Sequence, residues 1–279
     1  MAQIVDGKKL AQQVVNQLKK EADKLIKGGI KPKLVIVGIQ PDTRSQVYIR
    51  MKLKRAEEIG IDTQYVDLGK KNHAECIDAV QELSNDNGVH GIVLQLPLAG
   101  WYDPQDLIDY IDPNKDVDGL TSTNQTVLEQ NQPRIVPATP MAVMQILREY
   151  NVDIQDKVVA VIGRSHLVGM PLRYLLEHAG ARVLVGHRQI KDIAGLTKQS
   201  DIVISAAGSP GLLSADMIKS GAIVIDVGIN DVGGRLKGDV DFDSVKNIAS
   251  IITPVPGGVG PLTVVMILQN VLHSARITK

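Results

Sequence analysis

Residues 158–176 read VVAVIGRSHLVGMPLRYLL, and this stretch decides the fold class of the chain. Its first five residues are apolar and mostly β-branched, so they predict a parallel strand that is buried on both faces. Gly163 follows this strand, and leucines recur at helical spacing after Pro171. This order of strand, small-residue turn and helix is typical of units that bind a diphosphate at the helix N-terminus.

The turn has the pattern G-x-S-x-x-x-G, formed by Gly163, Ser165 and Gly169. It is one residue longer than the dinucleotide fingerprint G-x-G-x-x-G. Taken alone, the pattern supports nucleotide binding and an ordinary glycine turn equally.

The residues that follow the next predicted strand favour nucleotide binding over an ordinary glycine turn. His187 and Arg188 follow that strand, at the position where an NAD-binding fold offers Asp or Glu to the ribose hydroxyls. Arg188, together with Arg164, can pair with a 2′-phosphate through charge-assisted hydrogen bonds. We therefore expect NADP before NAD. The alternative is that Arg188 is a solvated loop charge.

Composition narrows the class of protein. The chain has 279 residues, of which 44% are hydrophobic, and this length suits two domains. Lys plus Arg and Asp plus Glu both total 31, so no basic field favours nucleic acid or an anionic membrane surface. The single Cys76 excludes an internal disulfide and fits a reducing compartment. No uninterrupted apolar run reaches about 18 residues, and we expect a soluble, cytoplasmic protein with a small-molecule partner.

Alternating helices and strands predict an α/β fold with two parallel sheets. In the N-terminal part we expect helices over 7–26, 45–59 and 74–83 and strands over 33–38, 62–68 and 90–94. In the C-terminal part we expect helices over 141–150 and 262–274 and strands over 158–162, 182–185, 201–205, 222–227 and 251–253. Residues 101–131 have little periodicity, which predicts a loop-rich connection.

Ligands of parallel sheets bind beyond the carboxyl ends of the strands, so residues after strands are the candidate site residues. Ser45, Tyr48 and Lys52 follow the first strand and share one face of a helix. A tyrosine ring can stack on a flat ligand, and desolvation can lower the pKa of the Lys52 ammonium toward proton transfer. The alternative is an exposed helix face.

Two polar residues near predicted strand ends are further candidates. Gln95 directly leaves a buried strand, where its amide must find a partner or line a cavity, although a structural role in the turn at Pro97 fits equally. Asp118 can accept two hydrogen bonds from an edge like that of an aminopyrimidine, or form an ordinary Asx turn.

Glycines near the C-terminus offer a second backbone surface. Gly257, Gly258 and Gly260 precede a helix that begins near Pro261, and a ligand can approach such a segment closely, unless it is only a tight turn. The six histidines have no metal-ligand spacing, so we expect no bound metal.

Five ordered motifs together resemble one family. They are SQVYIRMKLK (45–54), GIVLQLPL (91–98), KDVDG (115–119), GRSHLVGMP (163–171) and TPVPGGVGPLT (253–263). They are similar to motifs of the bifunctional methylenetetrahydrofolate dehydrogenase and methenyltetrahydrofolate cyclohydrolase family, the FolD type. The resemblance implies an N-terminal α/β folate-binding domain (1–137 with 264–279), a Rossmann-like NADP-binding domain (138–263), an active-site cleft between them, and a homodimer.

The resemblance also implies a reaction in one-carbon metabolism that serves purine biosynthesis. 5,10-Methylenetetrahydrofolate gives a hydride to NADP, and the methenyl product is hydrolysed to 10-formyltetrahydrofolate. By resemblance, Tyr48 packs on the folate, Lys52 is the catalytic lysine, Gln95 tunes it, and Asp118 holds the pterin ring. The hydride step needs orientation more than a base, whereas Lys52 serves as acid and base in the hydrolysis.

The same resemblance implies two sets of binding residues. The folate-binding residues are Ser45, Tyr48, Gln95, Asp118, Gly257, Gly258 and Pro261. The NADP-binding residues are Gly163, Arg164, Ser165, Gly169, Pro171, His187, Arg188, Ala207, Gly208 and Ile229.

Three segments depart from the family pattern. Leu120-Thr121-Ser122 stands where Phe-His-Pro is usual, Ala138 stands where Cys is common, and GHRQI (186–190) replaces a segment similar to Cys-His-Ser-Lys-Thr. The changed loop after Asp118 affects how the folate is positioned, and Arg188 in place of the usual Ser affects the choice between NADP and NAD. Two other hypotheses stay open: another oxidoreductase on a similar frame, of the shikimate or amino-acid dehydrogenase kind, and a catalytically idle folate- or nucleotide-binding protein.

Overall fold

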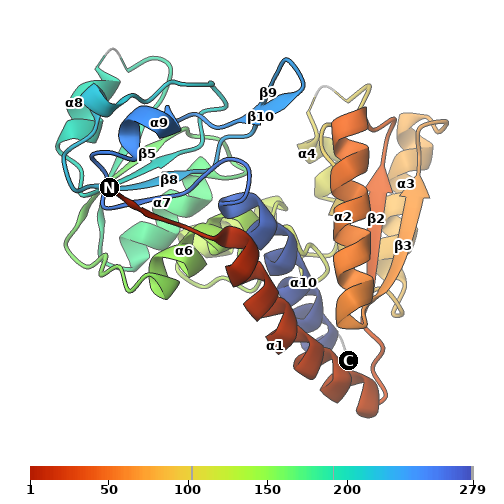
Figure 1. Ribbon diagram of the computed structural model, residues 1–279. Coiled ribbons are helices and arrows are strands. Elements are labelled where there is room, and N and C mark those ends of the chain that lie inside the picture. Colours follow the sequence, from red (N-terminus) through yellow and green to blue (C-terminus); the bar gives the residue numbers. More distant parts are fainter. Residues whose placement is uncertain (102, 191, 278–279) are drawn as a thin grey trace. The chain divides into compact units, whose positions relative to one another are not determined.

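The protein is described by a computed structural model that covers residues 1–101, 103–190 and 192–277. The chain divides into two compact units. Unit 1 comprises Met1–Ala11 and Thr139–Thr263, and unit 2 comprises Gln12–Ala138 and Val264–Lys279. Figure 1 follows the elements of both units along the chain.

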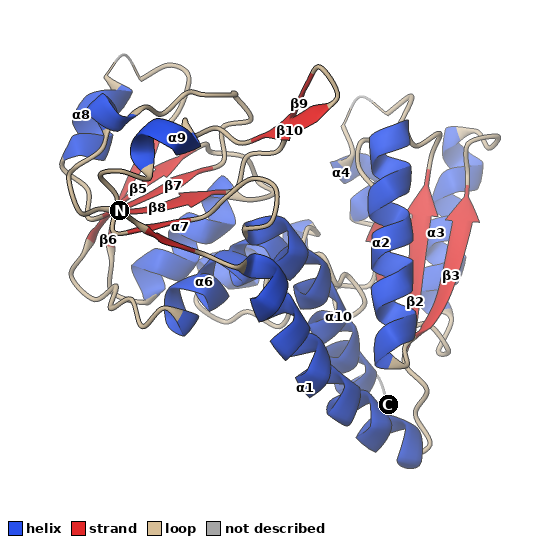
Figure 2. Cartoon of the chain, viewed as in Figure 1, coloured by secondary structure: helices blue, strands red, loops and turns tan. Residues whose placement is uncertain are grey.

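Unit 2 is built on a small parallel sheet in the order β3-β2-β4. Its strands are β2 (Lys33–Gly38), β3 (Asp62–Asp67) and β4 (Gly91–Leu94). The crossover helices are α2 (Thr43–Ile59) and α3 (His73–Asn85), which lie on opposite faces of the sheet (Figure 2). The expected parallel arrangement of helices and strands is confirmed.

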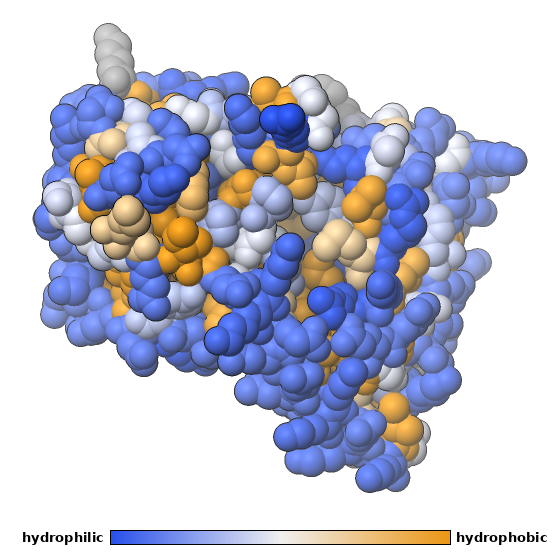
Figure 3. All heavy atoms as spheres, viewed as in Figure 1, coloured by the Kyte–Doolittle hydropathy of each residue, from blue (hydrophilic) through white to orange (hydrophobic). Residues whose placement is uncertain are grey.

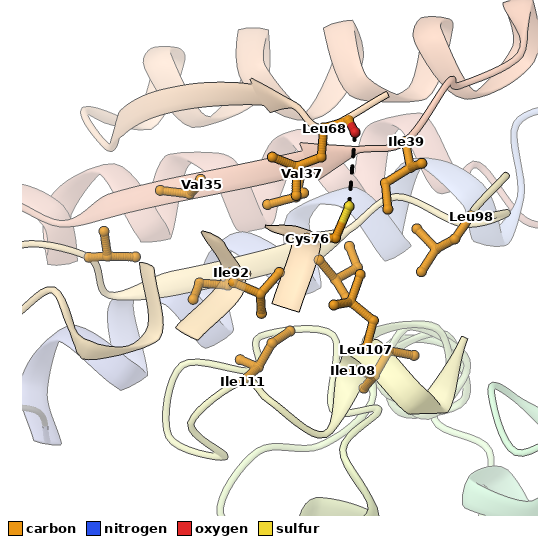
Figure 4. Packing of buried hydrophobic residues seen from close by; sticks show 13 residues of the cluster. Val35, Val37, Ile39, Leu68, Cys76, Ile92, Leu98, Leu107, Ile108 and Ile111 are labelled. Atoms are coloured by element: carbon orange, nitrogen blue, oxygen red, sulfur yellow. Dashed lines mark hydrogen bonds between the residues drawn. The ribbon is translucent and has the colours of Figure 1, made fainter. Parts of the chain in front are cut away.

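The core of unit 2 on the α3 side is apolar and tightly filled. Val35 and Val37 of β2 and Ile92 of β4 contribute to it, because alternate residues of a strand share one face (Figure 4). Cys76 of α3 is buried among them, and its thiol lies 3.9 Å from the carbonyl oxygen of Leu68. Burial raises the pKa of this thiol, so Cys76 acts here as a packed core side chain.

The stretch expected to be a loop-rich connection contains two helices, so that expectation is partly wrong. They are α4 (Gln105–Ile108) and α5 (Ser122–Glu129). The side chain of Thr121 accepts a hydrogen bond from the backbone N–H of Asn124, which caps α5. Only two side chains of α5 are buried, Asn124 and Leu128, and this is too few to produce a clear helical periodicity in the sequence.

The last helix, α10 (Val259–Ile277), is longer than expected, and its residues from Val264 onward belong to unit 2. The side-chain amide of Asn270 donates hydrogen bonds to the carbonyl oxygens of Val117 and Val136, both at 2.9 Å. Asn270 is buried, so it fixes two chain segments that lie more than a hundred residues away in the sequence.

Unit 1 contains a six-stranded parallel sheet in the order β1-β11-β8-β7-β5-β6. Its strands are β1 (Gln3–Ile4), β5 (Val158–Ile162), β6 (Arg182–Gly186), β7 (Ile202–Ser205), β8 (Ile223–Asp226) and β11 (Ile251–Ile252). The other elements are α6 (Ala138–Glu149), α7 (Gly169–His178), α8 (Ile193–Lys198), a 3₁₀ turn (Ala215–Met217), α9 (Phe242–Val245), and a hairpin of β9 (Asn230–Val232) and β10 (Arg235–Lys237). Buried strands β5, β7 and β8 confirm the expected Rossmann-like core.

The first eleven residues lie in unit 1, which differs from the expected domain boundary. β1 pairs in parallel with β11, with Gln3 opposite Ile251. Gly7, where helix α1 (Gly7–Lys27) begins, packs so closely that an added Cβ would lie 1.8 Å from the carbonyl oxygen of Gly258. A two-residue strand carries no periodicity, so the sequence gives no signal for this pairing.

The visible surface of both units is mostly hydrophilic, with small separate hydrophobic areas (Figure 3). Within the ranges that the structure describes, no helix is long and apolar enough to cross a membrane.

Replacing Asn270 tests its role in holding unit 2 together. Asn270→Leu removes both amide donors and leaves two carbonyl groups without them, so we expect the free energy of unfolding to fall by about 2 kcal/mol or more. Urea denaturation measures this change. The control is Gln269→Leu at the neighbouring exposed position, expected to change the value by about 0.5 kcal/mol or less. Equal effects of the two variants would contradict the assigned role.

Candidate active site

Helix α2 presents polar side chains on its buried face. The side chain of Asp42 accepts a hydrogen bond from the backbone N–H of Ser45 at 2.7 Å and so fixes where the helix begins. Ser45 and Lys52 are only 3% and 7% exposed, and Tyr48 is half-buried. The alternative of a wholly exposed helix face is therefore wrong for this part of α2.

The Lys52 ammonium is hydrogen-bonded to the amide of Gln95. Lys52 Nζ donates to Gln95 Oε1 at 3.1 Å, and Gln95 Nε2 donates to the carbonyl oxygen of Leu96 at 3.0 Å. The backbone N–H of Gln95 continues the sheet pattern by donating to Val37 O at 2.8 Å. The amide nitrogen of Gln95 is thus engaged by its own turn, which leaves the oxygen to face Lys52. Both suggested roles of Gln95, in the turn and toward Lys52, occur together.

Burial and a nearby carboxylate set the protonation of Lys52. Burial lowers the pKa of Lys52, and the negative charge of Asp118 partly opposes this shift. Burial raises the pKa of Asp118, the charge of Lys52 opposes that shift, and the charge of Asp116 adds to it. The structure therefore brings Lys52, Gln95 and Asp118 together in unit 2, with the pKa of the buried lysine lowered from its ordinary value.

A buried carboxylate that the sequence interpretation missed shapes the loop that carries Asp118. Asp116 accepts hydrogen bonds from the backbone N–H of Gly119 at 3.0 Å and of Thr121 at 2.7 Å. It also accepts one from the side-chain amide of Asn124 at 2.9 Å. Asp116 is 2% exposed, so these three bonds replace the water that its charge has lost. Asp116 and Asp118 both belong to the motif KDVDG, and nothing in the sequence shows that the first aspartate holds the loop while the second faces Lys52.

In unit 1, the expected cofactor residues gather at one edge of the sheet. The chain leaves β5 for β6 on one side and then places β7 on the other, so the strand order reverses at β5. In parallel sheets, ligands bind beyond the carboxyl ends of the strands at such a point. The expected NADP-binding residues lie in the loops after β5, β6, β7 and β8 and in the first turn of α7; they are Gly163, Arg164, Ser165, Gly169, Pro171, His187, Arg188, Ala207, Gly208 and Ile229.

The loop after β5 has room only for glycine at two positions. Gly163 has φ +123°, and a Cβ there would lie 2.3 Å from the carbonyl oxygen of Ala206. A Cβ on Gly169 would lie 2.1 Å from the carbonyl oxygen of Gly163. The loops after β5 and β7 therefore meet backbone to backbone. Such a bare backbone before a helix N-terminus fits a diphosphate.

Basic side chains line the neighbouring loops. Arg164 is exposed, and its Nη2 donates to Gln189 Oε1 at 3.5 Å, which links the loops after β5 and β6. Arg188 is also exposed, and His187 Nδ1 accepts from the backbone N–H of Gln189 at 3.3 Å. The exposure of Arg188 is compatible with both readings of that residue, a 2′-phosphate contact and a solvated charge.

The glycine segment near the C-terminus belongs to unit 1, whereas Lys52 belongs to unit 2. Gly257 has φ +109°, and a Cβ on Gly258 would lie 2.6 Å from the carbonyl oxygen of Pro254. A Cβ on Gly260 would lie 3.7 Å from Ile229 Cδ1, so this segment borders the loop after β8. Within unit 1, Gly257, Gly258 and Pro261 are thus grouped with the expected cofactor residues.

Among the residues placed by the structure, no group of three or more His, Cys, Asp or Glu side chains is arranged to hold a metal ion.

Family models match both parts of the chain. Residues 5–118 match the catalytic domain of tetrahydrofolate dehydrogenase/cyclohydrolase. Residues 137–279 match the NAD(P)-binding domain of the same enzymes.

Curated and solved relatives agree with these matches over the full length. The "Bifunctional protein FolD" of Macrococcus caseolyticus is 41% identical, with 99% of this chain and 98% of the relative covered. The crystal structure of the bifunctional enzyme FolD from Campylobacter jejuni is 38% identical, with a TM-score of 0.96 and 99% of both chains covered. FolD of Trypanosoma brucei, solved in complex with NADP cofactor and inhibitor, is 39% identical, with a TM-score of 0.93 and 99% and 97% covered. The chain belongs to the tetrahydrofolate dehydrogenase/cyclohydrolase family.

Proposed function

We propose that the protein oxidises 5,10-methylenetetrahydrofolate with NADP and hydrolyses the methenyl product to 10-formyltetrahydrofolate. The observation that carries this proposal is the buried Lys52, hydrogen-bonded to Gln95 and facing the charge of Asp118. A lysine with a lowered pKa is suited to take up and return a proton near neutral pH. Full-length similarity to bifunctional FolD proteins supports the same activity.

Unit 2 binds the folate in this proposal. The half-buried ring of Tyr48 packs on a flat ring of the substrate, and burial raises the pKa of its hydroxyl, so this hydroxyl stays protonated. Asp118 is partly exposed, and its carboxylate accepts two hydrogen bonds from the aminopyrimidine edge of the pterin. Ser45 lies on the same face of α2, with its hydroxyl 3.4 Å from Leu96 O.

Lys52 moves protons during the hydrolysis. Water adds to the methenyl carbon, and neutral Lys52 takes a proton from that water. The resulting ammonium returns the proton to N5 as the bond from the carbon to N5 breaks, and the hydroxyl proton leaves to solvent. The carbon then remains on N10 as a formyl group. Gln95 Oε1 accepts from Lys52 Nζ and so keeps the amine oriented through both transfers.

The edge of the sheet in unit 1 holds NADP. When bound, NADP accepts the hydride that leaves the methylene carbon. The glycine loop at Gly163 and Gly169 fits the diphosphate because a Cβ at either position would meet backbone atoms. Arg188 and Arg164 provide the positive charge for a 2′-phosphate. Ala207, Gly208 and Ile229, on the loops after β7 and β8, line the same edge.

The setting of the protein follows the family resemblance. We infer a homodimer that acts in the cytoplasm and supplies 10-formyltetrahydrofolate for purine biosynthesis. The single buried Cys76 supports a reducing compartment.

Removing the Lys52 amine separates the two activities. Lys52→Met keeps the aliphatic stem but removes the proton carrier, so we expect cyclohydrolase turnover to fall about 100-fold or more. The dehydrogenase rate falls much less because hydride transfer depends on orientation. Methenyltetrahydrofolate absorbance and NADPH formation measure the two steps. Lys54→Met, at an exposed lysine of the same helix, is the control. Unchanged cyclohydrolase turnover in Lys52→Met would disprove the assigned mechanism, and NADP or folate binding without any turnover in the wild type would favour the idle binding protein.

The pH profile tests the coupling of Lys52 to Asp118. Since the charge of Asp118 raises the pKa of Lys52 against the effect of burial, Asp118→Asn lowers that pKa further. The limb of cyclohydrolase kcat/KM that reports neutral Lys52 therefore moves to lower pH, even if folate binding also weakens. Asp78→Asn, which neutralises an exposed carboxylate on α3, leaves the limb in place. A shift to higher pH in Asp118→Asn would reverse the assigned electrostatics.

Arg188 decides the preference between cofactors. Arg188→Ser removes a charge that favours a 2′-phosphate, so the ratio of kcat/KM with NADP to kcat/KM with NAD falls about tenfold. Steady-state kinetics with each cofactor measure the ratio. Arg182→Ser is the control. Arg182 is exposed at the start of β6, whereas Arg188 follows the end of that strand. A ratio that stays constant in Arg188→Ser would mean that Arg188 is a solvated loop charge.

A further inference from the structure

The loop after β7 is held by one carboxylate, that of Asp239. The backbone N–H groups of Ala207, Gly208 and Ser209 donate to it at 2.7, 3.1 and 2.8 Å. The hydroxyl of Ser205 donates to it at 3.0 Å. Three successive N–H groups thus converge on one side chain, which fixes the path of the loop.

Asp239 is fully buried, and a fifth donor completes its surroundings. The side-chain amide of Asn230, where β9 begins, donates to Asp239 Oδ1 at 3.0 Å. A Cβ on Gly228 would lie 2.2 Å from the same carboxylate oxygen, so the carboxylate occupies the space a side chain would need there. The carboxylate therefore joins the loop after β7 to the segment after β8.

A second buried carboxylate fixes the backbone around Asp239. Asp226, the last residue of β8, accepts from the backbone N–H groups of Asp239 at 3.1 Å and Val240 at 2.9 Å. A Cβ on Gly238 would lie 1.9 Å from Asp226 Oδ2. Burial raises the pKa of Asp226 to about 6, an effect that the charge of Asp239 increases. The backbone of the motif GDVD (238–241) is thus held by Asp226, and this fixes the position of Asp239.

We propose that Asp239 is a positioning residue for the cofactor, whose carboxylate holds residues 205–209 in the conformation that receives NADP. This inference rests on the proposed function, in which Ala207 and Gly208 contact NADP. The N–H groups of Ala207 and Gly208 point at Asp239, and the preceding residue, Ala206, packs with its carbonyl group against Gly163 of the loop after β5. An amide in place of the carboxylate turns one of its ends into a donor, so it cannot accept all of the bonds that now converge there.

The experiment compares Asp239→Asn with Asp201→Asn. Asp201 lies at the amino-terminal ends of the strands of the same sheet, directly before β7. Asp239→Asn raises KM for NADP about tenfold or more, because charge-assisted bonds that shape the loop are lost. Its cyclohydrolase kcat/KM, measured with added methenyltetrahydrofolate and no NADP, stays within about twofold of the wild type. Asp201→Asn removes a carboxylate that accepts from the Val158 N–H and pairs with Lys219, and it leaves KM for NADP within about twofold.

A milder variant and a direct binding measurement keep the outcomes apart. Ser205→Ala removes one donor without disturbing the charge, and it raises KM for NADP by about threefold. Calorimetric titration with NADP alone gives Kd without turnover. An unchanged Kd in Asp239→Asn, or an equal rise of KM in Asp201→Asn, would overturn the inference. Wild-type protein that binds NADP but does not oxidise methylenetetrahydrofolate would count against the proposed function instead.

Discussion

A charged group that leaves water must be given polar partners inside the protein, and each unit meets this requirement at the carboxyl edge of a parallel sheet. In unit 2 the ionisable group is Lys52, with Gln95 as its hydrogen-bond acceptor. In unit 1 it is Asp239, with five donors. The strands bring these partners together because parallel strands end at a common edge, so the sheets determine where buried charge can be tolerated.

Lys52 and Lys115, which are both buried in unit 2, differ in their hydrogen-bond partners. Lys115 is a buried ammonium of unit 2 that donates to the carbonyl oxygens of Ser84 and Asp86, both at 2.7 Å. Among the residues that the structure describes, Lys52 makes one side-chain hydrogen bond, at 3.1 Å, and a carboxylate lies close by. Burial lowers the pKa of both lysines. In the proposed mechanism, the smaller number of protein acceptors around Lys52 leaves its protons available for transfer.

Local patterns made most of the fold predictable and placed the main candidate site residues on common elements. Apolar runs marked the central strands, and the spacing of Ser45, Tyr48 and Lys52 placed them on one helix face before any contact was known. The hydrogen bonds of Asp116 and Asp239 were not predictable. Asp239 accepts from groups more than thirty residues earlier in the chain, and an aspartate beside a glycine looks the same whether it caps a turn or holds a distant loop. The short strand β1 lacked a signal for a similar reason, because its pairing with β11 is long-range.

The role of Asp116 explains how the segment after Asp118 departs from the family pattern without losing its structure. Asp116 binds the backbone N–H groups of Gly119 and Thr121, and every residue except proline supplies such a group. The side chains at 120–122 are therefore free to differ, provided that the backbone keeps its path. Thr121 then adds a cap to α5 through its own hydroxyl. Backbone recognition by a buried carboxylate thus keeps Asp118 in place while the neighbouring side chains vary, as Asp239 does for the loop after β7.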